Sequence, residues 1–148
     1  MQTDNTTEIA AGTDRDFSFT VPTSMPDRIW YLWTTPSTWG RWDTGLRSVS
    51  MDGVMKLGST GRIQPLTGPK TRFTVVLFHP DTSYAFETML PLARLKVERF
   101  FNSDRTAFTH RVSFHGVAAV PFARLFGPAF RKALPPTMRN LNALAAET

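Results

Sequence analysis

The sequence contains no cysteine among its 148 residues. Disulfide bonds, thiol catalysis and zinc–thiolate sites are therefore excluded, and a cytoplasmic location is predicted. No stretch approaches the roughly 18 consecutive apolar residues that a transmembrane helix needs. The chain is thus predicted to have no integral membrane segment.

Charges of one sign form no cluster. The formal net charge is +5, yet thirteen of the seventeen basic residues are arginines spread from Arg15 to Arg139. Proteins that bind nucleic acid usually gather their cations on one element, so no nucleic-acid partner is predicted. There is no glycine-rich phosphate loop, no serine nucleophile elbow and no paired carboxylates of the glycosidase type. The three histidines make no metal triad, and neither a metal nor another cofactor is predicted.

Aromatic residues, by contrast, are abundant, with twelve phenylalanines and four tryptophans. Such side chains bring a large apolar area to a core or a pocket. The length of the chain fits one domain with one core. Residues 1–14 are polar and lack the basic start and apolar run of a signal peptide. We therefore predict a disordered leader over 1–14 and a single domain over 15–148.

The periodicity of apolar residues predicts the order of the elements. Residues 15–22 alternate as a half-buried strand, and 24–35 and 37–42 are predicted as short helices that carry the tryptophans. Strands are predicted at 46–53, 62–66, 71–78, 83–90, 92–101 and 106–114, separated by Gly, Pro and Asp turns. The rest, from 117 to about 146, is helical, and its three prolines are expected to kink or interrupt it. Strands joined by short turns, followed by one long helix, give a two-layer α+β domain with an antiparallel sheet.

Five segments in this order carry a family resemblance: FSFTVP at 17–22, IWYLWTTPSTWGRWD at 29–43, MDG at 51–53 with Gly58, ARLKVER at 93–99 and RTAFTHRVSFHG at 105–116. Together they resemble the polyketide cyclase/dehydrase and lipid-transport group of START-like proteins, in the SRPBCC superfamily. The resemblance implies a helix-grip fold, in which a curved antiparallel sheet wraps a long C-terminal helix and two short helices follow the first strand. Members include aromatase/cyclases, dehydratases and lipid carriers, which share a cavity between sheet and helix.

The inward faces of the central strands would line such a cavity, and they are mostly apolar, as ligand pockets usually are. Arg99 and His110 are the polar exceptions, and pairing across the 102–104 loop would bring them together. The arginine could hold a carboxylate, phenolate or enolate oxygen, and the histidine could transfer a proton. Both are candidate catalytic residues. The predicted ligand-binding residues are Trp39, Phe73, Val75, Leu77, Phe86, Thr88, Leu95, Val97, Arg99, His110, Val112, Phe122, Phe126 and Phe130.

These residues also have structural explanations. Arg99 could form an ion pair with a neighbouring glutamate, or face outward if the strand register shifts by one residue. His110 could be a satisfied core histidine. The tryptophans are favoured as packing at one end of the sheet, and Asp43 and Asp52 are interpreted as turn and strand-end residues.

Two functions from different classes follow. The favoured one is storage, transport or sensing of a hydrophobic or polycyclic small molecule or lipid, because the cavity face has few acid–base groups. The alternative is a polyketide cyclase or dehydratase acting on an aromatic or polyketide-like substrate, so the sequence leaves open whether the chain is an enzyme. A third hypothesis is a module that binds membrane surfaces or partners through its positive charge. The predicted partner is an apolar or aromatic small molecule, and the chain could be a monomer or a homodimer.

Overall fold

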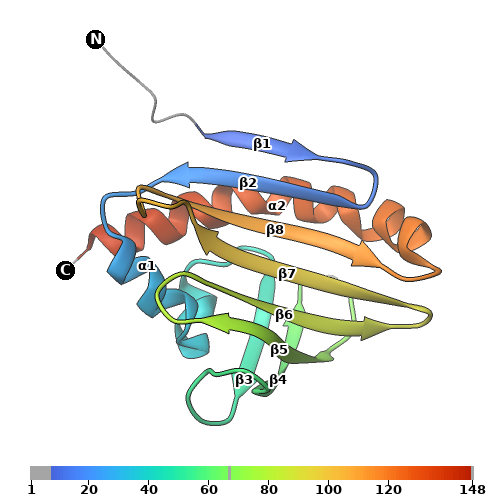
Figure 1. The fold of residues 1–148 in the computed structure, drawn as a ribbon. Helices are drawn as coiled ribbons and strands as arrows, with labels where there is room; N and C mark the ends of the chain where they lie inside the picture. Colours follow the sequence, from blue (N-terminus) through green and yellow to red (C-terminus); the bar gives the residue numbers. More distant parts are fainter. Residues whose placement is uncertain (1–7, 67, 148) are drawn as a thin grey trace.

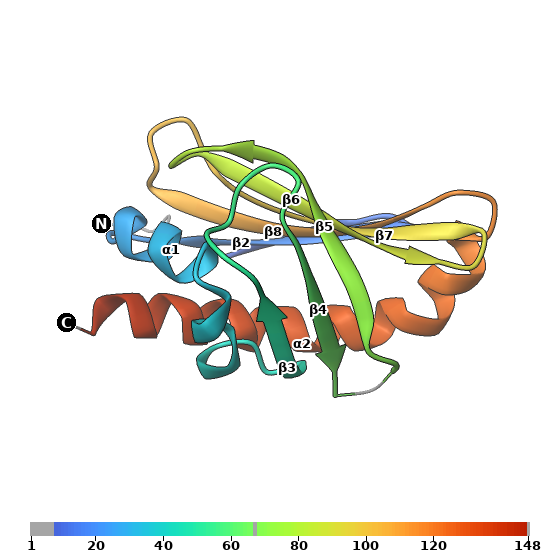
Figure 2. The same ribbon diagram turned by 90° about the horizontal axis from the view of Figure 1, so that it is seen from below.

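One curved antiparallel sheet grips one long helix in the computed structural model, which describes residues 8–66 and 68–147 (Figure 1). Within these residues the sheet has eight strands in the order β1-β2-β8-β7-β6-β5-β4-β3. The strands are β1 (Ile9–Gly12), β2 (Asp16–Pro22), β3 (Leu46–Met51), β4 (Thr60–Pro65), β5 (Thr71–His79), β6 (Ser83–Leu90), β7 (Ala93–Phe101) and β8 (Ala107–His115). Helix α2 (Ala119–Ala146) runs along the concave face of the sheet (Figure 2). The predicted helix-grip fold is confirmed.

Two short helices close one end of the sheet. Helix α1 (Pro26–Trp33) has its proline in the first turn and buries Ile29, Leu32 and Trp33, which are spaced as one helical face. A 3₁₀ helix, η1 (Pro36–Arg41), follows directly. The indole nitrogen of Trp39 donates to the carbonyl oxygen of Trp33 at 3.0 Å, so the two helices are fixed to each other and their aromatic side chains enter the core.

Helix α2 is continuous over 28 residues although Pro128, Pro135 and Pro136 lie inside it. The expectation that these prolines interrupt the helix is therefore wrong. Packing of an apolar face stabilises a helix more than local propensity does, and Met138 and Leu141 on this face are fully buried. The first turns nevertheless lie at an angle to the rest (Figure 2), as expected for a helix with an internal proline.

The predicted disordered leader is wrong for residues 9–12, which form β1 and pair antiparallel with β2. All four side chains of β1 are exposed, so the strand is held by its backbone hydrogen bonds and shows no hydrophobic alternation. Glu8, just before β1, forms an ion pair with Arg139 of α2 at 2.6 Å. Residues 1–7 lie outside the described part of the chain.

A β-bulge in β5 exchanges the inward and outward faces of that strand. Val75 pairs with Phe86, but the register then shifts and Leu77 pairs with Ala85. An extra residue on one strand inverts the alternation of every side chain beyond it. Phe78 therefore packs against the core in place of Leu77, and the prediction that Leu77 lines the cavity is wrong.

Candidate functional site

A cavity of about 140 Å³ lies between the concave face of the sheet and α2. Its walls come from β3 to β8, from the segment after η1 and from the middle of α2. Eight of the predicted ligand-binding residues line it, namely Phe86, Thr88, Leu95, Val97, Arg99, His110, Val112 and Phe130. Seven of them come from β6, β7 and β8, where successive side chains alternate without a break between the two faces of the sheet. This regularity is why the sequence could place these side chains inward.

The other predicted ligand-binding residues do not line this cavity. Trp39, Phe73 and Val75 are fully buried in the packed core beside it, where the ring centroids of Trp39 and Phe73 lie 6.0 Å apart. Phe122 and Phe126 stack on each other with ring centroids 5.9 Å apart, in the first half of α2. Like Leu77, these five positions lie outside the cavity wall, and a role for them in ligand binding stays a prediction of the sequence.

Arg99 and His110 are directly opposite each other on β7 and β8. Both side chains are buried, with exposed fractions of 4% and 2%. None of the ion pairs among the described residues includes Arg99, and Glu87 binds Arg94 instead, at 3.2 Å. The explanation of Arg99 as half of a structural ion pair with Glu87 therefore does not hold.

Aromatic side chains surround the guanidinium of Arg99. Its Cζ lies 4.6 Å from the ring centroid of Trp39 and 5.1 Å from that of Trp42. Nη1 donates to the hydroxyl of Tyr84 at 2.6 Å, whereas Nε is buried and has no hydrogen-bond partner among the described residues. Cation–π contacts and one hydrogen bond thus hold a buried cation that no carboxylate neutralises by direct contact.

A chain of hydrogen bonds continues from Arg99 to His110. The hydroxyl of Tyr84 donates to the carbonyl oxygen of Trp33 at 2.8 Å, and the indole nitrogen of Trp33 donates to Nε2 of His110 at 2.8 Å. Since Nε2 accepts this bond, the proton of the neutral imidazole sits on Nδ1. The Nε2 lone pair is therefore not free to take a proton from a ligand while the Trp33 bond is intact.

The surroundings keep the side chains of His110 and Tyr84 in this hydrogen-bond network neutral. Burial, reinforced by the charge of Arg99, lowers the pKa of His110 well below its usual value of 6.5. Burial raises the pKa of Tyr84 to about 12, although Arg99 opposes the shift. Arg99 is thus the cation of the network, and His110 and Tyr84 are dipoles around it.

Asp43 is a cavity residue that the sequence did not reveal. Its Oδ1 accepts from the backbone N–H of Gly45 at 2.9 Å, which is the turn role predicted for it. Burial raises the pKa of this carboxyl, while Arg99 and the Gly45 N–H oppose the shift. The following residue, Thr44, is fixed to α2 by a 3.0 Å contact between its hydroxyl and that of Thr137. Because this contact joins residues far apart in the sequence, no local sequence pattern reveals that Asp43 faces the cavity.

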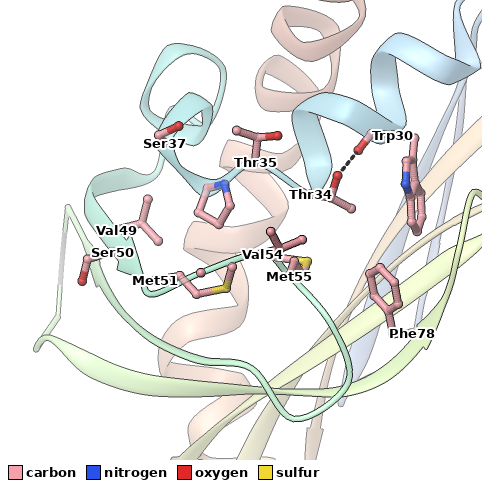
Figure 3. A pocket seen from close by; sticks show the side chains of 12 residues that line it. Trp30, Thr34, Thr35, Ser37, Val49, Ser50, Met51, Val54, Met55 and Phe78 are labelled. Carbon is pink, nitrogen blue, oxygen red and sulfur yellow. Dashed lines mark hydrogen bonds between the residues drawn. The ribbon is translucent and has the colours of Figure 1, made fainter.

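A second hollow opens on the surface near α1 and η1 and has no lining residue in common with the cavity. It measures about 560 Å³ and has no charged lining residue. Trp30 and Phe78 form one side, with ring centroids 5.7 Å apart, and Met51, Val54 and Met55 face them (Figure 3).

The described residues contain neither a cluster of metal ligands nor a helix that could span a membrane. Nowhere in 8–66 and 68–147 do three or more His, Asp or Glu side chains gather as metal ligands. The helices of the same ranges include none with the length and apolarity required to cross a bilayer.

Residues 16–147 match the family model described as polyketide cyclase/dehydrase and lipid transport. The chain belongs to this family. The resemblance read from the sequence is thereby confirmed, and it extends over nearly the whole polyketide cyclase-like domain. Among proteins with curated descriptions, none matches this chain.

Several solved structures share the fold of this polyketide cyclase family member. Protein MLL2253 from Mesorhizobium loti has a TM-score of 0.68 at 19% identity, over 90% of this chain and 98% of that one. Hypothetical protein jhp0584 from Helicobacter pylori has a TM-score of 0.68 at 13% identity, over 88% and 86% of the two chains. The di-domain ARO/CYC StfQ of the steffimycin biosynthetic pathway has a TM-score of 0.67 at 14% identity, over 90% of this chain and 52% of that one. At these identities the similarity shows the fold alone.

Proposed function

We propose that this protein binds a hydrophobic or polycyclic small molecule that carries an acidic oxygen, and that it stores, transports or senses this molecule without changing it. The observation that supports the proposal is Arg99, a buried cation at the cavity wall that no carboxylate of residues 8–66 and 68–147 contacts. The ligand oxygen would bind the guanidinium, and the apolar body of the ligand would lie against Leu95, Val97 and Val112.

The energetics favour such a ligand. Removing a cation from water costs several kcal/mol. A cation–π contact in a desolvated site offsets this cost by about 2 kcal/mol. The unpartnered Nε of Arg99 leaves part of its hydrogen-bonding capacity unused. A carboxylate, phenolate or enolate oxygen would supply both the missing acceptor and a negative charge in direct contact with the guanidinium.

The volume of the cavity limits the size of the ligand. About 140 Å³ is less than the roughly 300–1,000 Å³ of typical small-molecule pockets. A polycyclic ligand therefore requires α2 to move away from the sheet, whereas a smaller aromatic acid does not.

A cyclase or dehydratase is the second candidate function, and Asp43 is the observation that favours it. Asp43 lines the cavity together with Arg99, and its raised pKa suits a carboxyl that gives or takes a proton. His110 is less suited to this role because Trp33 occupies its Nε2. Turnover of an aromatic polyketide-like substrate that is lost in Asp43→Asn, with binding retained, would establish the enzyme in place of the carrier.

The proposal is tested with matched pairs of aromatic carboxylic acids and their methyl esters, by thermal shift and calorimetry. A ligand that binds only the folded state stabilises it by about 2.7 kcal/mol at one hundred times its Kd. We expect the acid to stabilise the wild type more than the ester does. Arg99→Met should remove this difference, while Arg47→Met, on the exposed part of β3, should preserve it.

Equal stabilisation by acid and ester, or full binding of the acid by Arg99→Met, would contradict the proposed role of Arg99. The cytoplasmic location and the choice between monomer and homodimer stay predictions of the sequence.

A further inference from the structure

Three exposed apolar side chains lie at one end of the sheet. Met89 and Leu92 belong to the β6–β7 hairpin and Val117 to the β8–α2 loop, with exposed fractions of 73%, 76% and 90%. The N–H of Ala118 donates to the carbonyl oxygen of Leu92 at 2.9 Å, so the two loops are fixed side by side. Both views of the fold show them together beside the start of α2 (Figures 1 and 2). We call Met89, Leu92 and Val117 the apolar tip.

The backbone of Leu92 is unusual for its residue type. Its φ is +59°, in the left-handed region that favours Gly, Asn and Asp. A leucine here carries backbone strain and also leaves a large apolar side chain in water. Such a combination at a turn suggests that the side chain is kept for what it contacts outside the molecule.

Basic residues flank the apolar tip. Helix α2 begins at the tip and contains no acidic residue, and Arg124 lies exposed in its second turn. Arg94 is directly opposite Met89 on one side and directly opposite His115 on the other. Its own carboxylate partner is Glu87.

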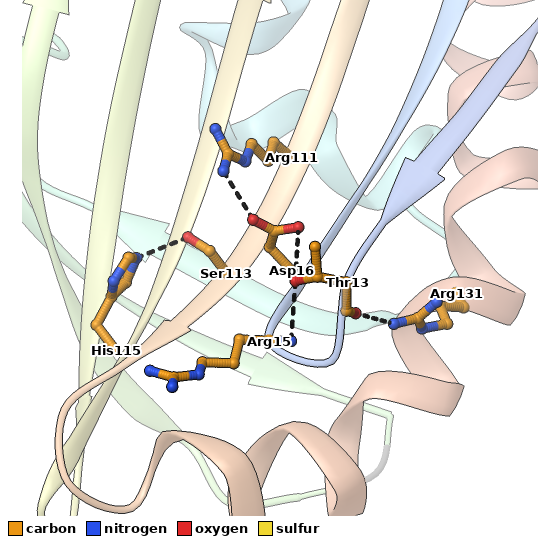
Figure 4. A network of polar contacts seen from close by, with 7 residues as sticks. All are labelled: Thr13, Arg15, Asp16, Arg111, Ser113, His115 and Arg131. Atoms are coloured by element: carbon orange, nitrogen blue, oxygen red, sulfur yellow. Dashed lines mark hydrogen bonds and ion pairs between the residues drawn. The ribbon is translucent and has the colours of Figure 1, made fainter.

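A polar hollow of about 440 Å³ lies beside these loops, between the β1–β2 turn and the end of β8 (Figure 4). Arg15, Ser113 and His115 line it, and the hydroxyl of Ser113 lies 2.9 Å from Nε2 of His115. Two carboxylates also line it. Asp16 is bound to Arg111 at 2.7 Å, and Asp14 has no ion-pair partner within the described part of the chain. The hollow therefore offers an arginine and a histidine next to the apolar tip.

We propose that this end of the molecule docks on a lipid membrane with anionic headgroups. The apolar tip enters the interfacial region of the bilayer, and Arg15, Arg94 and Arg124 face the lipid phosphates. Interfacial binding strength rises with buried apolar area and with attraction of basic residues to anionic lipids. The inference does not depend on the ligand of the internal cavity.

A second copy of the chain fits this surface less well. Three protruding side chains are far fewer than the roughly 20–30 residues per side of a stable protein interface. A symmetric contact would also bring the arginines of one copy against those of the other. An anionic lipid surface matches both the small protruding shape of the apolar tip and the positive charge of the arginines beside it.

The test is co-sedimentation of the full chain with vesicles of phosphatidylcholine, with and without phosphatidylglycerol. Wild type should bind the anionic vesicles and lose this binding near 1 M salt, where the Debye length is about 3 Å. Replacing both Leu92→Asn and Val117→Ser should weaken binding roughly tenfold or more. Arg124→Gln should weaken it about fivefold at low salt.

The controls are placed away from the tip. Leu57→Asn makes the same change at a residue of similar exposure, 64%, in the β3–β4 loop, and Arg47→Gln removes a charge from β3. Both should bind as wild type does. Because asparagine suits the backbone of Leu92 better, Leu92→Asn should raise the melting temperature while it weakens vesicle binding, so misfolding cannot explain the loss.

Three outcomes would overturn the proposal. The first is absence of wild-type binding to anionic vesicles at low salt. The second is binding that tip variants and control variants reduce equally. The third, checked by sedimentation velocity without lipid, is a wild-type dimer that the tip variants dissociate, which would make the tip a self-association surface.

Discussion

Acidification is expected to destabilise the protein through His110, and the size of the effect follows from its contacts. The imidazole is buried and accepts the Trp33 indole N–H at Nε2, at 2.8 Å. Protonation of Nε2 would break this bond and place a second cation beside Arg99. The folded protein therefore resists protonation at His110, and the pKa of this residue lies well below 6.5.

The sign of the effect follows from linkage. Below about pH 6.5 the unfolded chain takes up a proton at His110 that the folded chain does not, so stability falls as pH falls. The loss is about 1.4 kcal/mol per pH unit, until the pH reaches the folded-state pKa. Above pH 6.5 neither state binds this proton and the contribution is fully present.

The assay is urea denaturation of wild type and His110→Gln at intervals from about pH 7 to about pH 5. Glutamine offers an oxygen to the Trp33 indole but does not titrate. The variant should therefore show a flatter loss of stability, and the exposed control His79→Gln should follow the wild type. Parallel curves for wild type and His110→Gln over this range would refute the reasoning.

The remaining predictions concern packing. Arg99→Met replaces a buried cation with a shorter apolar chain and should raise the free energy of unfolding by about 1 kcal/mol. A loss of more than that in denaturation experiments would show that the Tyr84 bond and the aromatic contacts outweigh the desolvation cost. Gly61→Ala should cost about 2 kcal/mol or more, because a Cβ there overlaps the backbone oxygen of Ser50. The added Cβ of Gly127→Ala has no neighbouring atom within 4 Å, so this variant should instead gain about 0.5–1 kcal/mol of helix stability. Equal melting temperatures of the two alanine variants would contradict both of these predictions.

Regular alternation made much of the fold and part of the site predictable. Strands β7 and β8 keep an uninterrupted period of two, so the order of residues along the chain is enough to place Arg99 and His110 opposite each other. The prediction depended only on the hairpin loop between them. Leu77 shows the limit of the same reasoning, because a bulge of one residue has no compositional signal in a run of β-branched and aromatic residues.

The other misses depend on contacts distant in sequence. Strand β1 has exposed side chains that are mostly small, and what defines it is pairing with β2. Asp43 looks like a turn residue because it is one, and it faces the cavity only because α2 returns to pack against its loop. The unbroken α2 likewise reflects burial against the sheet, which outweighs the cost of three internal prolines.

The ring of aromatic side chains around Arg99 also has an optical consequence. Indole emission responds to nearby charge and hydrogen bonding, and the rings of Trp39 and Trp42 lie 4.6 and 5.1 Å from the Arg99 guanidinium, while the Trp33 N–H is bound to His110. Any occupant that neutralises the guanidinium changes the field at three of the four tryptophans. The protein thus carries a built-in fluorescent reporter of its own cavity, and an unlabelled sample can be titrated directly.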